Sequence, residues 1–100
     1  MKIFISQPMR DKTKVEILKE RSKIVSELQD KYGKDLEILY SVISSKDDYE
    51  EIKNIPVWHL SHSIDLLSKA DKVYFAKGWK NARGCRIEHK ICEEYGIEIY

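Results

Sequence analysis

Glu88 is the residue whose type and position most directly indicate chemistry. It lies one turn past Gly84, in the stretch 77–96, KGWKNARGCRIEHKICEEYG, which follows the apolar run 73–76. The stretch begins as a glycine-bearing loop and turns into a helix pattern. α/β proteins build ligand sites from such a loop and helix, because the helix N-terminus offers free N–H groups and the positive end of its dipole. A carboxylate there can act as a base, as a nucleophile or as an acceptor for a sugar hydroxyl.

The start of the predicted helix also suits an anion. Arg83 and Gly84, with the N–H groups of the two residues that follow, predict a phosphate site. Arg10, on a loop after the first predicted strand, can reach the same phosphate from across a crevice. An exposed arginine that contacts only water is the simpler interpretation of Arg10. Arg86 has another possible role, because it can pair with Glu88 or with a neighbouring subunit.

Other reactive side chains have two interpretations each. Trp79 can stack a base beside the crevice or pack in the core, and both suit a large aromatic residue. Cys85 lies near a helix N-terminus, which lowers a thiol pKa, and His89 follows one turn later, so the two can be a nucleophile and its base. A small packing residue is the simpler interpretation of Cys85. His59 and His62 have a metal-binding spacing, but no third ligand is suitably spaced, so we expect no metal site and no cofactor.

The whole chain is typical of one small globular domain, spanning residues 1–100. Hydrophobic residues make up 42% and charged residues 35%, and the net charge is +1, so we expect no nucleic-acid partner. No apolar run reaches the roughly 20 residues of a membrane span, and the chain begins with a strand pattern rather than a signal peptide. Cys85 and Cys92, roughly 10 Å apart along a helix, are too distant for a disulfide. We therefore expect a cytoplasmic protein without a membrane partner.

Four short apolar runs predict strands over residues 3–5, 36–40, 73–76 and 97–100. Helix patterns lie between them, and this alternation favours a parallel sheet with helices on both faces. Right-handed crossovers then favour the strand order 2-1-3-4, a small flavodoxin-like (Rossmann-like) α/β sheet. The crevice of such a sheet opens between the first and third strands, so the loops 6–11 and 77–84 are expected to face each other.

Three helices are expected to cover the sheet. The first runs from an N-cap at Thr13 to about Tyr32, and its apolar stripe is Ile17, Leu18, Ile24, Val25, Leu28 and Tyr32. The second covers residues 57–70, and the candidates for its inward face are Trp58, Leu60, Ile64 and Leu67. The third carries Glu88. Residues 41–54 are polar and too long for a tight turn, so they are predicted to form a loop over the site.

Three segments resemble the nucleoside 2-deoxyribosyltransferase-like proteins, above all their small bacterial and phage members. The segments are IFISQPMR, SIDLLSKADKVYFA and GWKNARGCRIEHKICEEYGI, and the resemblance covers nearly the whole chain. It implies a flavodoxin-like fold, no metal, and cleavage or exchange of the N-glycosidic bond of 2′-deoxynucleosides or their 5′-monophosphates. Relatives place a nucleophilic Glu in a pattern like Gly-Thr-x-x-Glu-x-Gly. Residues 84–88, GCRIE, occupy the matching place, so the resemblance implies that Glu88 is the nucleophile.

The chain departs from the family pattern at three places. Gln7 stands where the first loop usually has Gly, although the Pro-Met that follows remains. Ser63 stands where the second helix usually carries an Asp that positions its partners and exchanges a proton with them, and Asp65 lies on another face of that helix. Ala82 stands where an Asp often precedes the glycine loop. The missing second-helix Asp favours nucleotide binding without catalysis, which is the alternative function.

Three function hypotheses follow from these patterns. The first is an enzyme of N-glycosidic chemistry with Glu88 as its nucleophile, the second a protein that senses or sequesters a nucleotide, and the third a structural subunit that acts through assembly. The first two take a nucleoside or nucleotide as their partner. The expected substrate contacts are Ser6, Gln7, Pro8, Met9, Arg10, Ser63, Gly78, Trp79, Asn81, Arg83 and Gly84. We also expect at least a homodimer, because the last strand leaves an apolar edge and the second helix carries surplus aromatic residues.

Overall fold

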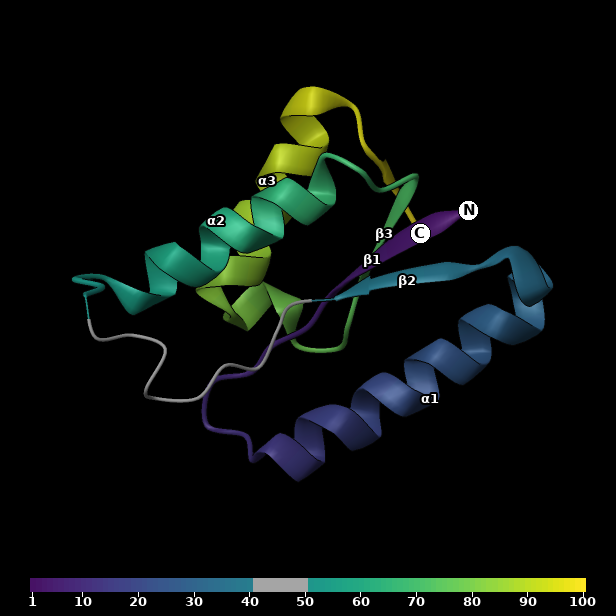
Figure 1. The fold of residues 1–100 in the computed structure, drawn as a ribbon, viewed down its shortest axis with the longest axis horizontal. Coiled ribbons are helices and arrows are strands. Elements are labelled where there is room, and N and C mark those ends of the chain that lie inside the picture. The colour runs from purple at the N-terminus through teal and green to yellow at the C-terminus, as the bar shows by residue number, and fades with distance from the viewer. Residues whose placement is uncertain (41–50) are drawn as a thin grey trace.

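The computed structural model describes residues 1–40 and 51–100. Within them, four parallel strands form a sheet in the order β2-β1-β3-β4, which confirms the predicted flavodoxin-like α/β fold (Figure 1). The strands are β1 (Lys2–Ser6), β2 (Glu37–Tyr40), β3 (Lys72–Phe75) and β4 (Glu98–Ile99). β1 and β3 are neighbours, and Ser6 lies opposite Phe75, so their carboxyl ends meet at one edge of the sheet.

Helices cover both faces of this sheet. α1 (Lys14–Tyr32) lies on one face, and α2 (Ile55–Leu67) and α3 (Arg83–Tyr95) lie on the other (Figure 1). The 3-10 turns η1 (Gly33–Asp35) and η3 (Trp79–Asn81) precede β2 and α3. None of the helices in the described ranges is long and apolar enough to cross a membrane.

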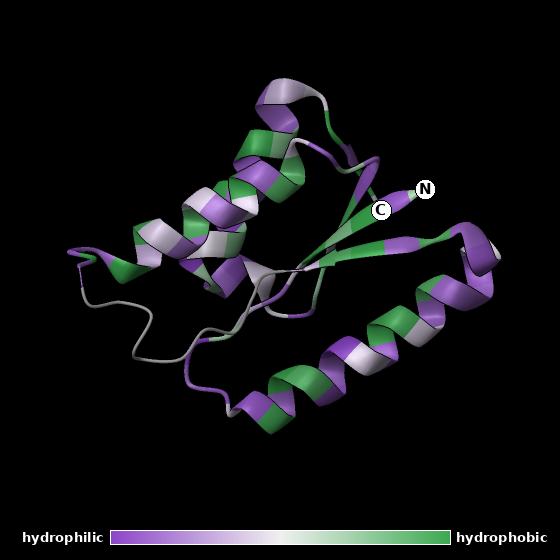
Figure 2. Cartoon of the chain, viewed as in Figure 1, coloured by the Kyte–Doolittle hydropathy of each residue, from purple (hydrophilic) through white to green (hydrophobic). Residues whose placement is uncertain are grey.

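Two apolar cores join the layers, one on each side of the sheet. The buried residues on the α1 side are Ile3, Ile5, Ile24, Leu28 and Ala76, and those on the other side are Phe4, Leu67, Val73 and Cys92. β1 supplies both cores because successive side chains of a strand point to opposite faces. Figure 2 shows hydrophobic residues running through the strands and alternating with polar residues along the helices. Each buried large aliphatic or aromatic side chain contributes about 1.5–3 kcal/mol, so these cores dominate the stability of the fold.

The helices begin and end at residues suited to their termini. Thr13 Oγ1 accepts a hydrogen bond from the Glu16 N–H at the start of α1, and Asn54 Oδ1 accepts one from the Val57 N–H at the start of α2, each at 3.1 Å. These caps satisfy N–H groups that have no partner inside the helix. Gly33 follows α1 with a φ of 79°, a left-handed value that glycine adopts without strain.

Two apolar residues predicted to face the core are partly exposed instead. Leu18 on α1 is 45% exposed and Ile64 on α2 is 42% exposed, whereas Arg21 and Ser63 are each 6% exposed. The predicted inward stripes are therefore wrong at these positions. Polar residues can take inward places when hydrogen-bond partners compensate for their burial, and Arg21 and Ser63 both have such partners, as described below.

Several predicted element boundaries also differ from the structure. α2 ends at Leu67 rather than at residue 70, and β4 is shorter than the four residues predicted for it. Of the loop predicted over residues 41–54, the part at 41–50 lies outside the described residues.

Candidate functional site

Glu88 lies at the carboxyl edge of the sheet, in a small polar cluster with Ser6 and Ser63. Ser6 is the last residue of β1, Ser63 lies on α2, and Glu88 lies in the first half of α3. The Ser6 hydroxyl donates a hydrogen bond to Glu88 Oε1 at 2.9 Å. Ser6 is 1% exposed, and Ser63 and Glu88 are each 6% exposed, so three elements enclose the carboxyl group.

The sequence places Glu88 inward through ordinary strand and helix geometry. Cys85, Glu88 and Cys92 are the buried residues of α3, at the spacing that puts side chains on one helix face. On β1, Phe4 and Ser6 share the face toward α2 and α3, because strand side chains alternate. The Ala76 N–H donates to the Ser6 carbonyl at 2.9 Å, which extends the pairing of β1 and β3 up to the site.

Burial raises the pKa of the Glu88 carboxyl to about 7, and hydrogen bonds from Ser6 and Ser63 act in the opposite direction. Removing a carboxylate from water disfavours its charged form, and two hydroxyl donors recover only part of that cost. The group is therefore present in both protonation states near neutral pH. A carboxyl group with such a pKa can give or take a proton, or attack when ionised.

Cys85 lies beside this cluster, but its thiol is not activated. Burial is the largest influence and raises its pKa, and the charge of Glu88 also raises it, whereas Ser6 and Lys12 lower it. The pKa of the Cys92 thiol also rises, to about 11. Desolvation outweighs the helix N-terminus, so the structure favours the simpler interpretation of Cys85 as a packing residue over the nucleophile. Both cysteines are free, as expected from their separation.

Within the described residues, His89 contacts Glu93 and two aromatic rings and forms no hydrogen bond with Cys85. Its ring stacks on Trp79, with ring centres 4.1 Å apart and planes inclined by 10°, and also contacts Phe75 at 4.8 Å. Its Nδ1 forms a pair with Glu93 Oε1 at 2.9 Å. The half-buried Trp79 thus has one ring face occupied by His89.

Gln7 points to the opposite side of the sheet from Ser6. Its Nε2 donates to the Ile17 carbonyl at 2.9 Å and to Glu20 Oε1 at 3.1 Å. Its Oε1 accepts from Arg21 Nε at 3.2 Å. The Gln7 side chain, predicted to contact substrate, therefore ties the first loop to α1, away from the Glu88 carboxyl.

The two loops predicted to face each other do meet. A Cβ atom at Gly78 would lie 3.8 Å from Pro8 Cγ, which is ordinary contact. Gly78 has a φ of 88°, so backbone conformation rather than space favours glycine there. Pro8 and Met9 are half-buried and Arg10 is exposed. The first loop thus packs on the glycine loop beside the Glu88 cluster.

The remaining predicted contacts lie on the rim of the site. Asn81, Arg83 and Gly84 are exposed, and Arg83 is the first residue of α3. Arg86 does not pair with Glu88 within the described residues, because its Nη1 donates to the Lys80 carbonyl at 3.1 Å. The N-terminus of α3 therefore offers an exposed cation on the helix that carries Glu88.

Lys12 is a cation of the first loop that the sequence analysis missed. Its charge acts on Cys85, and its Nζ pairs with Glu20 Oε2 at 3.4 Å. Lys12 thus pairs with α1, and its charge also reaches Cys85 near the start of α3. Lys12 lies between Arg10 and the N-cap Thr13, and this place in the first loop could have indicated it as a candidate site residue.

Asp65 and His62 have partners other than Glu88. Asp65 is exposed and pairs with Lys69 Nζ at 3.2 Å, so it does not replace the missing second-helix carboxylate. His62 packs on Trp58, with ring centres 4.2 Å apart. In the parts of the chain that the structure describes, no three His, Cys, Asp or Glu side chains are grouped to hold a metal ion.

A family model described as "Domain of unknown function (DUF4406)" matches residues 1–100. No curated protein and no solved structure matches the chain.

Proposed function

The chain belongs to the DUF4406 family, and we propose that it is an enzyme that cleaves or exchanges the N-glycosidic bond of a (deoxy)nucleoside or its 5′-monophosphate. The observation that carries this proposal is the Glu88 carboxyl, buried against Ser6 and Ser63 where β1 and β3 end. A resemblance to nucleoside 2-deoxyribosyltransferase-like proteins, through residues 84–88, supports the same role. The two free cysteines fit the reducing cytoplasm that we propose as its location.

The proposed reaction begins with ionised Glu88. Cleavage of an N-glycosidic bond builds positive charge on the sugar ring, and a carboxylate close to that ring stabilises it. A Glu88 oxygen then bonds to the anomeric carbon as the electron pair of the broken bond leaves with the base, which takes up a proton. Water or a second base attacks the glycosyl ester and frees the carboxylate. The Ser6 hydroxyl, 2.9 Å from Oε1, holds the carboxyl in place throughout.

The alternative is a protein that binds a nucleotide without cleaving it. The second-helix position holds Ser63 rather than an acid, and Asp65 pairs with Lys69 on the exposed side of α2. A Glu88 carboxyl that is partly protonated at neutral pH also serves well as a hydrogen-bond donor to a ligand. These two observations are the ones that support recognition without turnover.

One experiment separates the two functions. The purified chain is incubated with a panel of nucleosides, 2′-deoxynucleosides and their 5′-monophosphates, and free base is measured by chromatography. Binding of the same compounds is measured in parallel by calorimetry. Base release with at least one compound supports the enzyme. Tight binding of a nucleotide without base release supports the alternative. If no compound is bound and none releases its base, both functions are contradicted.

Arg83 is expected to bind the 5′-phosphate of a nucleotide at the start of α3. Replacing Arg83 by alanine should weaken the binding of a 5′-monophosphate by about 1–3 kcal/mol, which is the scale of hydrogen bonds to charged groups. It should barely affect the binding of the matching nucleoside. Lys90→Ala is the matched control, because Lys90 is an exposed cation of the same helix that pairs with Glu94. Equal losses for both ligands, or equal losses in both variants, would show that Arg83 does not read phosphate.

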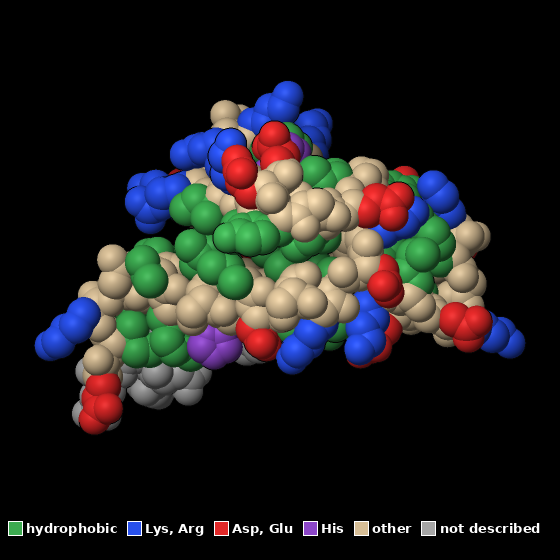
Figure 3. Space-filling view, turned by 90° about the horizontal axis from the view of Figure 1, so that it is seen from above, with side chains coloured by type: hydrophobic (Ala, Val, Ile, Leu, Met, Phe, Trp, Pro, Cys, Tyr) green, Lys and Arg blue, Asp and Glu red, His purple; other side chains and the backbone are tan. Residues whose placement is uncertain are grey.

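We also propose that the chain forms at least a homodimer through its α2 and α3 side. Figure 3 shows hydrophobic side chains gathered on that side. Val57 is 58% exposed, Ile64 42% and Ile87 38%, and such side chains seldom cluster on the surface of a monomer. One chain has a mass of 11.8 kDa, so light scattering coupled to size exclusion should find a heavier species. Val57→Glu should shift the measured mass toward that of one chain. A concentration-independent mass of one chain would contradict the proposal.

A further inference from the structure

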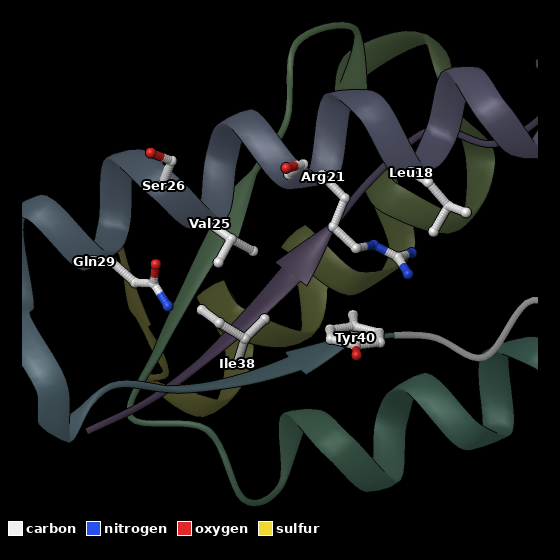
Figure 4. A pocket seen from close by; sticks show the side chains of 8 residues that line it. Leu18, Arg21, Val25, Ser26, Gln29, Ile38 and Tyr40 are labelled. Carbon is white, nitrogen blue, oxygen red and sulfur yellow. The ribbon is translucent and has the colours of Figure 1, made fainter.

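A groove runs between α1 and the edge strand β2, on the face of the sheet opposite Glu88 (Figure 4). Its volume is about 410 Å³, which suits a small organic ligand. Apolar and polar side chains share its lining, namely Leu18, Val25 and Ile38 together with Ser22, Ser26 and Gln29. The lining therefore offers an apolar bed with hydroxyl and amide groups beside it.

Arg21 is the unusual member of this lining. Its side chain extends from α1 across the groove to Tyr40, and its guanidinium carbon lies 4.6 Å from the centre of that ring (Figure 4). The residue is 6% exposed, and Nε donates to Gln7 Oε1 at 3.2 Å. Nη2 is buried and has no hydrogen-bond partner among the residues that the structure describes. Unpaired buried donors of this kind are rare, because each costs the full desolvation of the group.

Among the described residues, the positive charge of Arg21 also has no carboxylate partner. Glu20, the acidic residue of the same hydrogen-bond network, accepts from Lys12 Nζ at 3.4 Å and from Gln7 Nε2 at 3.1 Å instead. The ion pairs among the described residues leave Arg21 out. Burial lowers the pKa of the guanidinium, and the Tyr40 oxygen acts in the opposite direction. An oxyanion that reached Nη2 would compensate for this burial and form a charge-assisted hydrogen bond.

We propose that this groove binds a small organic oxyanion, a carboxylate or a phosphate monoester with an apolar body. The charged group of the ligand bonds to Arg21 Nη2, and its body lies along Val25 and Ile38. Tyr40 is 49% exposed and lies beside the guanidinium, so the anion is expected to reach Arg21 past this ring. The site is separate from Glu88, and it stands or falls independently of the glycosidic function.

The test is a titration of the full chain, followed through the methyl NMR signals of Val25 and Ile38. The probes are benzoate, phenyl phosphate and the neutral benzyl alcohol. We expect at least one of the anions to shift both signals and to bind at least about tenfold more tightly than benzyl alcohol, since one charge-assisted bond is worth that factor. Comparing the two anions identifies which oxyanion the site prefers.

Two variants decide whether Arg21 is responsible. Arg21→Gln should lower the affinity for the anion at least about tenfold. Lys23→Gln, which removes an exposed cation from the same helix, should leave that affinity unchanged. Should Arg21→Gln fail to fold, Ser26→Trp fills the groove from an exposed position, keeps Arg21, and should abolish binding. Any of three results would overturn the proposal. They are binding of benzyl alcohol as tight as that of the anions, unchanged binding of the anion by Ser26→Trp, and anion-induced shifts only in the signals of residues 77–84.

Discussion

Replacing Glu88 by glutamine is expected to lower the rate of base release at least about 10³-fold, the scale on which losing a catalytic nucleophile acts. Glutamine has nearly the same size and can still accept the hydrogen bond that Ser6 Oγ donates at 2.9 Å. Its amide cannot form the glycosyl ester, so the reaction loses its covalent route. Single-turnover release of free base from the best compound of the panel measures the effect.

Glu94→Gln is the matched control for this experiment. Glu94 lies on the same helix, is exposed and pairs with Lys90 at 3.0 Å, so its loss should leave the rate unchanged. The wild-type rate should also rise as pH increases through about 7, because only ionised Glu88 can attack. Base release by Glu88→Gln at the wild-type rate would exclude Glu88 as the nucleophile.

The free energy of unfolding is expected to fall as pH rises from about 4.5 to about 7, by up to about 3 kcal/mol, because of Glu88 alone. Between these values the folded chain keeps a proton on Glu88 that the unfolded chain has already released. Raising the pH therefore favours unfolding across this window. The contribution of Glu88 is at its largest below pH 4.5, and it is lost once pH exceeds the folded pKa of about 7. Denaturant unfolding at half-unit pH steps measures the curve.

Glu88→Gln serves as the reference for this second measurement, because glutamine does not titrate. The difference between the two curves isolates Glu88 from other groups such as His59. Burial lowers the pKa of His59, so that residue makes stability rise with pH and partly masks the slope of the wild type. Parallel curves for wild type and Glu88→Gln would show that the Glu88 pKa is not raised in the folded chain.

The fold could be predicted from the sequence because its signals are local. Strands and helices alternate along the chain, and residues such as Thr13 and Gly33 mark helix ends without reference to anything distant. The strand order then follows from the right-handed crossover, which leaves few topologies for four parallel strands. The meeting of the two loops after β1 and β3 followed in turn, with Pro8 against Gly78.

The roles of individual side chains were harder to predict, because they depend on partners far along the chain. Ser6 and Gln7 are neighbours of similar polarity, yet Ser6 bonds to Glu88 and Gln7 to α1. Side chains alternate along a strand, so Ser6 lies on the same face as the buried Phe4, which is the Glu88 side. Gln7 follows the end of β1, where this alternation no longer predicts which face its side chain takes. The burial of Arg21 has no local signal, since Lys19 and Lys23 beside it are exposed and its partner Gln7 is 14 positions away.

The hydrogen bond between Ser6 and Glu88 joins residues that are 82 positions apart. β1 precedes its strand partners in the chain, and it also precedes the carboxyl that its last residue holds. Contacts of such long separation form late, because the loop they close costs entropy before they contribute anything. A nascent or half-folded chain thus leaves Glu88 in water with an ordinary acidity. The raised pKa and the enclosed carboxyl arise together, once α3 has docked on the sheet, so any chemistry at this site is confined to the folded protein.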